Sequence, residues 1–187
     1  MENQEDRIGK ILNEHGYAIN QRYKATSFVY QVVNNSMEFF VVKFNDLEIP
    51  EDLAMIQREF SVAEKLRGLD GVGCFEEFYS RGFMFGGIRP YIDGEELCFF
   101  ELKKNPKIKK KIFRGLDDIH SCGVAHFDFK CGDLLRMRNV LLDKNSNPYF
   151  IDFGGCVLRD EAGSLNFDYE CNRDVEKLEK RLGGQLI

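Results

Sequence analysis

The stretch that most constrains the fold runs from His126 to Gly154. Two short apolar runs, 139–143 and 148–152, flank the polar segment 144–147, and this pattern predicts a β-hairpin. A His-x-Asp-x-Lys segment precedes the hairpin, and Asp-Phe-Gly (152–154) ends it. Carboxylates and an amide are oxygen ligands for a hard cation, and a lysine attracts phosphate. The order of these residue types is therefore suited to chemistry on a metal-bound phosphate.

The composition allows one domain or two small lobes that share a cleft, because the chain has 187 residues. The net charge of −5 argues against general nucleic-acid binding. A lysine cluster between Lys103 and Lys111 is interpreted as the solvated start of a helix. No apolar run approaches the ~20 residues that a membrane-spanning helix needs.

The six cysteines include no Cys-x-x-Cys pair, and the chain has only three histidines, so a zinc site is not expected. The N-terminus is polar and charged and lacks the features of a signal peptide. We therefore expect reduced thiols and a cytoplasmic protein.

Hydrophobic periodicity predicts an α+β order of elements. Strands are expected within 17–44 and 74–92, and helices over 51–67, 106–122 and about 172–182. In the run Phe39–Phe44, alternation places Val41 and Lys43 on one face, and Val42 and Phe44 on the other. A lysine in such a strand is costly to bury unless an anionic group meets it. We place a boundary between an N-terminal lobe, residues 1–92, and a C-terminal lobe, residues 93–187.

The segment 126–154 resembles the protein-kinase-like superfamily, and most closely its small atypical branch, which includes the RIO kinases and the bacterial lipopolysaccharide kinases. The resemblance implies a minimal two-lobed fold. Its N-lobe would hold an antiparallel sheet with one helix, and its C-lobe would be helical and reduced. Only 33 residues follow Gly154, without an Ala-Pro-Glu motif, which agrees with a reduced C-lobe.

The resemblance assigns roles to residues around the hairpin. Asp128 would be the catalytic base that accepts the proton of the attacking hydroxyl, and Lys130 would steady the transferred phosphate. Asp152 would bind the metal that bridges the phosphates, Mg²⁺ or Mn²⁺. His-x-Asp-x-Lys alone is a weak signal, whereas Asp-Phe-Gly gains weight from the strand before it and from Asn139.

Asn139 would be the second metal ligand, although its spacing departs from the family pattern. It lies eleven residues after Asp128, where the family has five, so the segment 131–138 contains about six extra residues. Asp133 in this insertion is a rival ligand. The insertion also contains Arg136 and Arg138, which would either grip phosphate or belong to a tolerated loop extension.

Lys43 would pair with the α- and β-phosphates of ATP, and Glu59 would hold Lys43 by an ion pair. Glu59 is preferred to Glu64, which lies more than a helical turn further along. The expected phosphate loop contains no glycine, and its Ser-x-Val-Tyr ending looks like the RIO-type loop. Thr26 and Ser27 are candidate phosphate contacts there, and a simple hairpin turn is the alternative.

The segment 88–95 resembles the hinge between the lobes. Its likeness to the family implies that the Pro90 carbonyl and the Ile92 N–H bind adenine. The expected activity is transfer of the γ-phosphate of ATP to a hydroxyl, either of a protein Ser or Thr, or of a small molecule or sugar. A pseudokinase scaffold and a regulatory ATPase remain alternatives.

Overall fold

The fold is α+β, as predicted. The computed structural model describes five stretches of the chain, residues 3–23, 28–46, 50–81, 84–125 and 136–181. The chain divides into two units: Met1–Gln57 with Phe75–Tyr91, and Arg58–Cys74 with Ile92–Ile187. Each unit has its own sheet and its own hydrophobic core.

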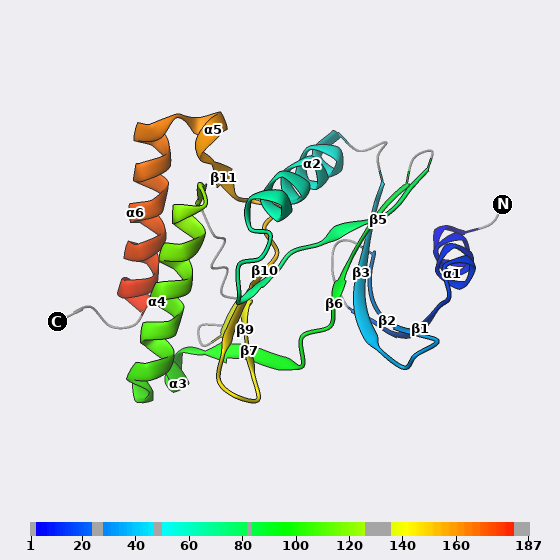
Figure 1. The fold of residues 1–187 in the computed structure, drawn as a ribbon, viewed down its shortest axis with the longest axis horizontal. Helices are drawn as coiled ribbons and strands as arrows, with labels where there is room; N and C mark the ends of the chain where they lie inside the picture. The colour runs from blue at the N-terminus through cyan, green and yellow to red at the C-terminus, as the bar shows by residue number, and fades with distance from the viewer. Residues whose placement is uncertain (1–2, 24–27, 47–49, 82–83, 126–135, 182–187) are drawn as a thin grey trace. The chain divides into compact units, whose positions relative to one another are not determined.

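The first unit is built on an antiparallel sheet of five strands in the order β1-β2-β3-β6-β5 (Figure 1). The strands are β1 Tyr17–Arg22, β2 Phe28–Asn34, β3 Phe39–Asp46, β5 Glu76–Arg81 and β6 Met84–Pro90. The β-prone run FFVVKF lies in β3, at the centre of this sheet. The predicted strands in this part of the chain are therefore confirmed.

A helix that the sequence analysis did not predict, α1 (Gln4–Glu14), precedes the sheet. The side chain of Asn3 caps it by accepting a hydrogen bond from the Asp6 N–H at 2.8 Å. Its buried residues, Ile8, Ile11 and Leu12, lie at helical spacing and form one core with the sheet. That spacing was the signal for this helix, and it lies within an otherwise polar segment.

The predicted division of β3 into two faces is confirmed. Val42 and Phe44 belong to the core that α1 covers, and Lys43 points to the other face. Gly86 of β6 lies against Phe44, because a Cβ atom at Gly86 would be only 2.7 Å from the Phe44 Cε1 atom. The absence of a side chain at Gly86 thus allows the phenylalanine ring to pack on the backbone.

The second unit contains a four-stranded sheet in the order β4-β10-β9-β7, and a two-stranded sheet of β8 and β11. The strands are β4 Val72–Gly73, β7 Gly94–Cys98, β8 Val124–Ala125, β9 Arg136–Asp143, β10 Pro148–Ile151 and β11 Val157–Leu158. The predicted hairpin is β9–β10, with Leu142 opposite Pro148. The backbone N–H groups of Asn147 and Asn145 donate to the Asp143 carboxylate, which closes the turn and lowers the pKa of Asp143.

Helices pack around these strands within the second unit. They are α3 Phe99–Lys104, α4 Pro106–Ser121, α5 Arg159–Ala162 and α6 Ser164–Arg181, together with the C-terminal half of α2 Pro50–Lys65. The predicted helices over 51–67 and 106–122 are confirmed as α2 and α4. No helix within the five described stretches is long and apolar enough to cross a membrane.

The predicted start of the last helix, near Asn172, is wrong, because α6 begins at Ser164. Gly163, with a φ of 73°, separates α6 from α5, and such a left-handed conformation favours glycine. Phe167 is buried, and the Arg159 guanidinium lies 4.5 Å from its ring centroid. The packing of Phe167 therefore helps to hold the extra turns, and the spacing of apolar residues in this segment does not predict it.

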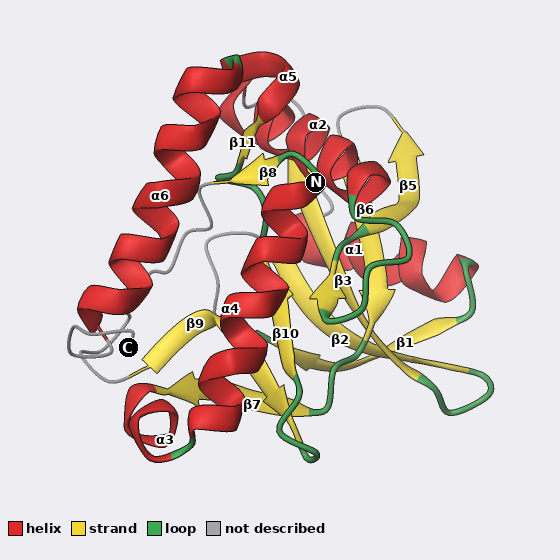
Figure 2. Cartoon of the chain, turned by 60° about the vertical axis from the view of Figure 1, so that its left-hand side comes forward, coloured by secondary structure: helices red, strands yellow, loops and turns green. Residues whose placement is uncertain are grey.

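The core of the second unit lies between α4 and the sheet. The apolar stripe of α4 is buried there: Ile108, Ile112, Leu116 and Ile119. Gly115 lies against Phe150 of β10, and a Cβ atom at Gly115 would be 2.6 Å from the Phe150 Cε2 atom. Figure 2 shows α4 and α6 side by side in this unit. The same packing holds the β9–β10 hairpin, which carries Asn139 and leads into Asp152.

Candidate functional site

Lys43 lies in the middle of β3, on the sheet face opposite the core of the first unit. It pairs with Val29 of β2 and with Gly87 of β6. The half-buried side chain places its Nζ atom 5.9 Å from the ring centroid of Phe75. A cation near the face of an aromatic ring is attracted by the ring's quadrupole. The predicted phosphate-binding lysine is thus held on an apolar face by an aromatic contact.

Arg89 is a second cation on this face, and the sequence analysis missed it. It lies two residues beyond Gly87 on β6, and strand alternation therefore puts it on the face of Lys43. Its guanidinium carbon lies 5.4 Å from the Phe75 ring centroid, and only 7% of the residue is exposed. The signal in the sequence was an arginine inside an apolar strand, the same signal that singled out Lys43.

The predicted adenine acceptor, the Pro90 carbonyl, already receives a hydrogen bond. The Arg89 Nη1 atom donates to this oxygen at 3.1 Å. The other hinge residue, Ile92, belongs to the second unit, where its carbonyl accepts from the Gly94 N–H at 2.9 Å. The adenine contacts proposed for Pro90 and Ile92 remain predictions.

In the second unit, Asp152 follows β10 and has a φ of 64°. A residue other than glycine seldom adopts this left-handed conformation, and such strain is concentrated at functional sites. The carboxylate is exposed, and Gly154 follows it two residues later. An unfavourable backbone conformation at Asp152 therefore accompanies an exposed carboxylate at the end of a strand.

Glu59 brings a second carboxylate to the same place. Its Oε1 atom lies 3.1 Å, and the Asp152 Oδ1 atom 3.9 Å, from the point where Gly154 would carry a Cβ atom. The neighbouring residue on α2, Arg58, donates to the Cys156 carbonyl at 2.9 Å and to the Glu161 carboxylate at 2.7 Å. These bonds fix this turn of α2, and with it Glu59, beside the Asp-Phe-Gly segment. The ion pair of Glu59 with Lys43 remains a prediction.

Asn139 lies on β9, and only 8% of it is exposed. The hairpin pairs Val140 with Phe150, and continuing this register places Asn139 opposite Ile151, next to Asp152. Asn139 and Asp152, the two predicted metal ligands, are far apart in sequence, and the hairpin brings their backbones close together.

These donors suit a hard divalent cation. Asp152 and Glu59 would offer carboxylate oxygens, Asn139 would offer an amide oxygen, and a nearby cation would relieve the repulsion between the two carboxylates. Among the described residues, no group of three or more His, Cys, Asp or Glu side chains is arranged to hold a metal by itself. The donor set fits Mg²⁺, which keeps several of its ligands from water and phosphate.

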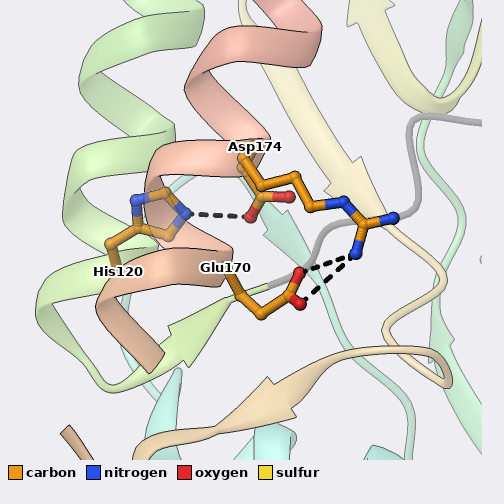
Figure 3. Close-up of polar contacts among 4 residues, drawn as sticks. His120, Glu170 and Asp174 are labelled. Atoms are coloured by element: carbon orange, nitrogen blue, oxygen red, sulfur yellow. Dashed lines mark hydrogen bonds and ion pairs between the residues drawn. The ribbon is translucent and has the colours of Figure 1, made fainter. Parts of the chain in front are cut away.

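A buried acid on α6, Asp174, was also missed by the sequence analysis. Figure 3 shows its carboxylate facing His120 of α4, and the Oδ2 atom lies 3.0 Å from the His120 Nε2 atom. Asp174 is 0% exposed, whereas the nearby pair of Glu170 and Arg173 lies near the surface. The buried pair joins α4 and α6, and both helices contact β8, the strand that precedes His126 in the chain.

Two cysteines of the second unit, Cys156 and Cys171, are poorly suited to act as reactive thiols. Cys156 is buried, and this burial raises the pKa of its thiol well above the ordinary range, with Asp174 adding to the effect. Burial likewise raises the pKa of Cys171 to about 11. A thiol with a raised pKa stays protonated at neutral pH and is a poor nucleophile.

Several predicted residues lie outside the described stretches. These are Thr26, Ser27, Asp128 and Lys130, together with the rival ligand Asp133. Their roles remain predictions from the resemblance. Of the predicted phosphate- and metal-binding residues that the structure describes, Lys43 lies in the first unit, and Glu59, Asn139 and Asp152 lie in the second.

A comparison with known proteins supports a kinase-like relation at a coarse level. A stretch of 70 residues is 34% identical to the MAP kinase kinase kinase win1 of Schizosaccharomyces pombe. This stretch is 37% of the present chain and 4% of that protein. No protein-family model matches the chain.

Proposed function

We propose that the protein is a phosphotransferase that moves the γ-phosphate of ATP to a hydroxyl acceptor. The observation that carries this proposal is the strained Asp152 at the end of β10, with Glu59 and Asn139 beside it. The similarity to a MAP kinase kinase kinase supports a kinase-like enzyme in general terms.

In the proposed site, oxygen-bearing side chains would bind the metal and lysines would bind the phosphates. Asp152 and Asn139 would hold a Mg²⁺ or Mn²⁺ ion, which neutralises charge on the phosphates when it is bound. Lys43 would attract the α- and β-phosphates. Asp128 would accept the proton of the attacking hydroxyl, and Lys130 would steady the phosphoryl group. Catalysis by such a set is positioning together with electrostatic stabilisation.

We propose a Ser or Thr hydroxyl of a protein as the acceptor, because the relative of similar sequence is named a MAP kinase kinase kinase. A small-molecule or sugar hydroxyl is the alternative, in line with the resemblance to the lipopolysaccharide kinases. Labelled phosphate that reaches proteins but not sugars would support the first acceptor. The reverse pattern would support the second.

The deciding experiment incubates the purified chain with γ-labelled ATP and Mg²⁺ or Mn²⁺. The wild type should transfer label to protein or release phosphate. Asp152→Ala should reduce this rate by a factor of about 10² to 10³, the reduction that follows when an enzyme loses one electrostatic contact to the transition state. Asp168→Ala is the matched control, since Asp168 is an exposed acid on α6. Metal-dependent nucleotide binding that survives in Asp152→Ala would refute the metal assignment.

A pseudokinase is the second candidate, and one observation favours it. The carbonyl that would accept from adenine, Pro90 O, is already bonded to Arg89. A wild-type chain that shows no turnover with either metal, yet binds nucleotide, would establish this alternative. Hydrolysis without any phosphorylated acceptor would instead indicate a regulatory ATPase.

A further inference from the structure

We propose that the N-terminal half of α4 binds an acidic segment of a partner protein through a basic stripe on its exposed side. The basic stripe consists of Lys107, Lys110 and Arg114, which follow one another at spacings of three and four residues and therefore share one face of the helix. The inference goes beyond the proposed function, because this surface of the second unit holds none of the residues proposed for phosphoryl transfer.

The cations of the basic stripe are accessible and are not neutralised by nearby acids. Lys107, Lys110 and Arg114 are all exposed, and none of them forms an ion pair with another residue of the five described stretches. Figure 2 shows α4 in the foreground of this unit, with α3 beside its N-terminal end. Helix α3 contributes Lys103, a further exposed cation just before the stripe. The surface can therefore meet an anionic partner directly.

Helix stability does not account for this placement of charge. The N-terminus of a helix is the positive end of its macrodipole, where acidic residues are favourable and lysines are not. The first turn of α4 contains no acidic residue, and Asp117 and Asp118 lie in its C-terminal half instead. Lys110 also has a like charge three residues before it, at Lys107, and four residues after it, at Arg114, and such neighbours repel. The stripe therefore lowers helix stability, and binding of an anion would offset this loss.

Lys111, at the edge of the basic stripe, ties the helix to the β9–β10 turn. Its Nζ atom donates to the Asn147 Oδ1 atom at 2.8 Å and to the Ser146 carbonyl at 3.4 Å. The same turn carries Lys144, which is exposed and lies two residues before Ser146. The cations thus belong to a helix packed on the core and to a turn bonded to that helix, and a surface that is already ordered loses less entropy when it binds.

The dimensions of the basic stripe fit a short extended segment. Lys107 and Arg114 are seven residues apart, which corresponds to about 10 Å along the helix axis. An extended segment with acids at every second position presents carboxylates about 6.8 Å apart, close to the rise of about 6 Å between helix residues four apart. Asp117 and Asp118 follow the stripe on α4 and would repel a longer acidic run. We therefore expect the acidic part of the partner segment to be only a few residues long.

Nucleic acids and anionic membranes fit this surface less well than a peptide does. The chain has a net charge of −5, so the remainder of the protein repels an extended polyanion, whereas a short peptide contacts the basic stripe alone. A helix that binds a membrane surface places its apolar side in the lipid. The apolar side of α4 is buried in the core of the second unit.

The test measures the fluorescence anisotropy of a labelled peptide, titrated with the full chain at low salt. The probe has Glu at alternate positions among Ala and Gly, and its reference has Gln in place of Glu. The wild type should bind the Glu peptide at least about tenfold more tightly than the Gln peptide, the sum of several exposed ion pairs. The triple variant Lys107→Gln, Lys110→Gln and Arg114→Gln should lose this preference. Its urea midpoint should be no lower than that of the wild type, because repulsion within the helix is relieved.

The matched control combines Arg7→Gln, Arg67→Gln and Lys180→Gln. These cations are exposed and lie elsewhere in the chain, and their loss removes the same three charges, which changes the net charge from −5 to −8. The control should keep the wild-type preference for the Glu peptide. An equal loss of preference in both triple variants would overturn the inference, because general electrostatic attraction would then explain the binding. Equal affinity of the wild type for the Glu and Gln peptides would overturn it as well.

Vesicles containing phosphatidylserine and a single-stranded oligonucleotide are tested beside the peptide. Binding of either one that is tighter than that of the Glu peptide, and that is lost in the triple variant of the basic stripe, would overturn the choice of an acidic peptide. These measurements contain no ATP, so their failure leaves the proposed function intact. Absence of phosphoryl transfer would likewise overturn the proposed function without touching this inference.

Discussion

The two units present opposite charges at their candidate site residues. The first unit carries Lys43 and Arg89 on one face of its sheet, both near the Phe75 ring. The second carries the carboxylates of Glu59 and Asp152 at the end of the β9–β10 hairpin, with Asn139 beside them. Cations suit the phosphates of a nucleotide, and oxygens suit its metal. Under the proposed function, the first unit would contribute the cations and the second unit the oxygen ligands.

The largest expected effect tests the cationic half. Lys43→Met should reduce phosphoryl transfer by about 10² to 10³, because a positioned charge near the phosphates is lost. Its dependence on metal concentration should stay the same, since the oxygen ligands belong to the other unit. Steady-state rates over a Mg²⁺ titration measure both quantities.

Lys109→Met is the matched control for this variant. Lys109 also lies 5.9 Å from a phenylalanine ring centroid, that of Phe113 on α4, and has no predicted role in the site. It should keep the wild-type rate. A Lys43→Met variant as active as Lys109→Met would refute the proposal that the first unit contributes a phosphate-binding cation.

The next largest effect is a loss of stability in the two hydrophobic cores. In each core a phenylalanine ring packs against a glycine. Gly86→Ala and Gly115→Ala should each lower the free energy of unfolding by about 1–3 kcal/mol through overpacking against Phe44 and Phe150. Gly115 lies in a helix, where alanine regains part of this loss through its helix propensity, so Gly86→Ala should be worse. Urea unfolding measures the size of each effect.

Hydrogen exchange read by mass spectrometry shows where each variant loosens. We expect faster exchange in the altered unit alone, because each phenylalanine belongs to a separate core. Gly9→Ala is the control, since no atom lies within 4 Å of the added Cβ and the helix should become slightly more stable. Equal loosening of both units by Gly86→Ala would contradict the separation of the cores.

A third prediction compares two polar side-chain pairs within the second unit (Figure 3). His120→Ala removes a hydrogen-bond partner of the fully buried Asp174 and should cost about 1–3 kcal/mol of the free energy of unfolding. Arg173→Ala breaks the more exposed pair with Glu170 and should cost only about 0.2–0.5 kcal/mol. Thermal and urea unfolding of both variants give the comparison, and equal losses would show that burial of the pair carries no weight.

The smallest expected effect is a pH dependence on the surface of the second unit. Lys65 on α2 bonds Asp160 on α5 and lowers the pKa of this acid below its ordinary 3.8. A lowered folded-state pKa stabilises the fold above the unfolded-state pKa, and the contribution is lost as the pH falls through the folded-state value. Asp160→Asn should therefore lower the urea midpoint slightly at pH 7, and the difference from wild type should shrink as the pH falls through the folded-state pKa. A difference that persists at low pH would assign the effect to something other than this charge.

Much of the fold followed from local patterns. The strands of the first unit, the helices α2 and α4, and the hairpin were predicted, because period-two alternation and helical apolar stripes are strong in these segments. Helix α1 was not predicted, since its few apolar residues lie among many charges, and the first turns of α6 were missed because their apolar residues, Leu165, Phe167 and Tyr169, alternate and do not form a helical stripe. Only packing against the sheet, or against Arg159 in the case of Phe167, reveals that these residues are buried.

By itself, the sequence determined the α+β class, the two faces of β3 with Lys43 on the less apolar one, and a hairpin that leads into Asp152. These features depend on residue spacing and on short-range geometry, and both can be predicted from the local sequence. Tertiary structure alone decided that Glu59 lies beside Gly154, that Arg89 bonds the Pro90 carbonyl, and that Asp174 faces His120. Each of these contacts depends on the rotamer of a side chain and on the local path of the backbone, and neither can be read from the spacing of residue types.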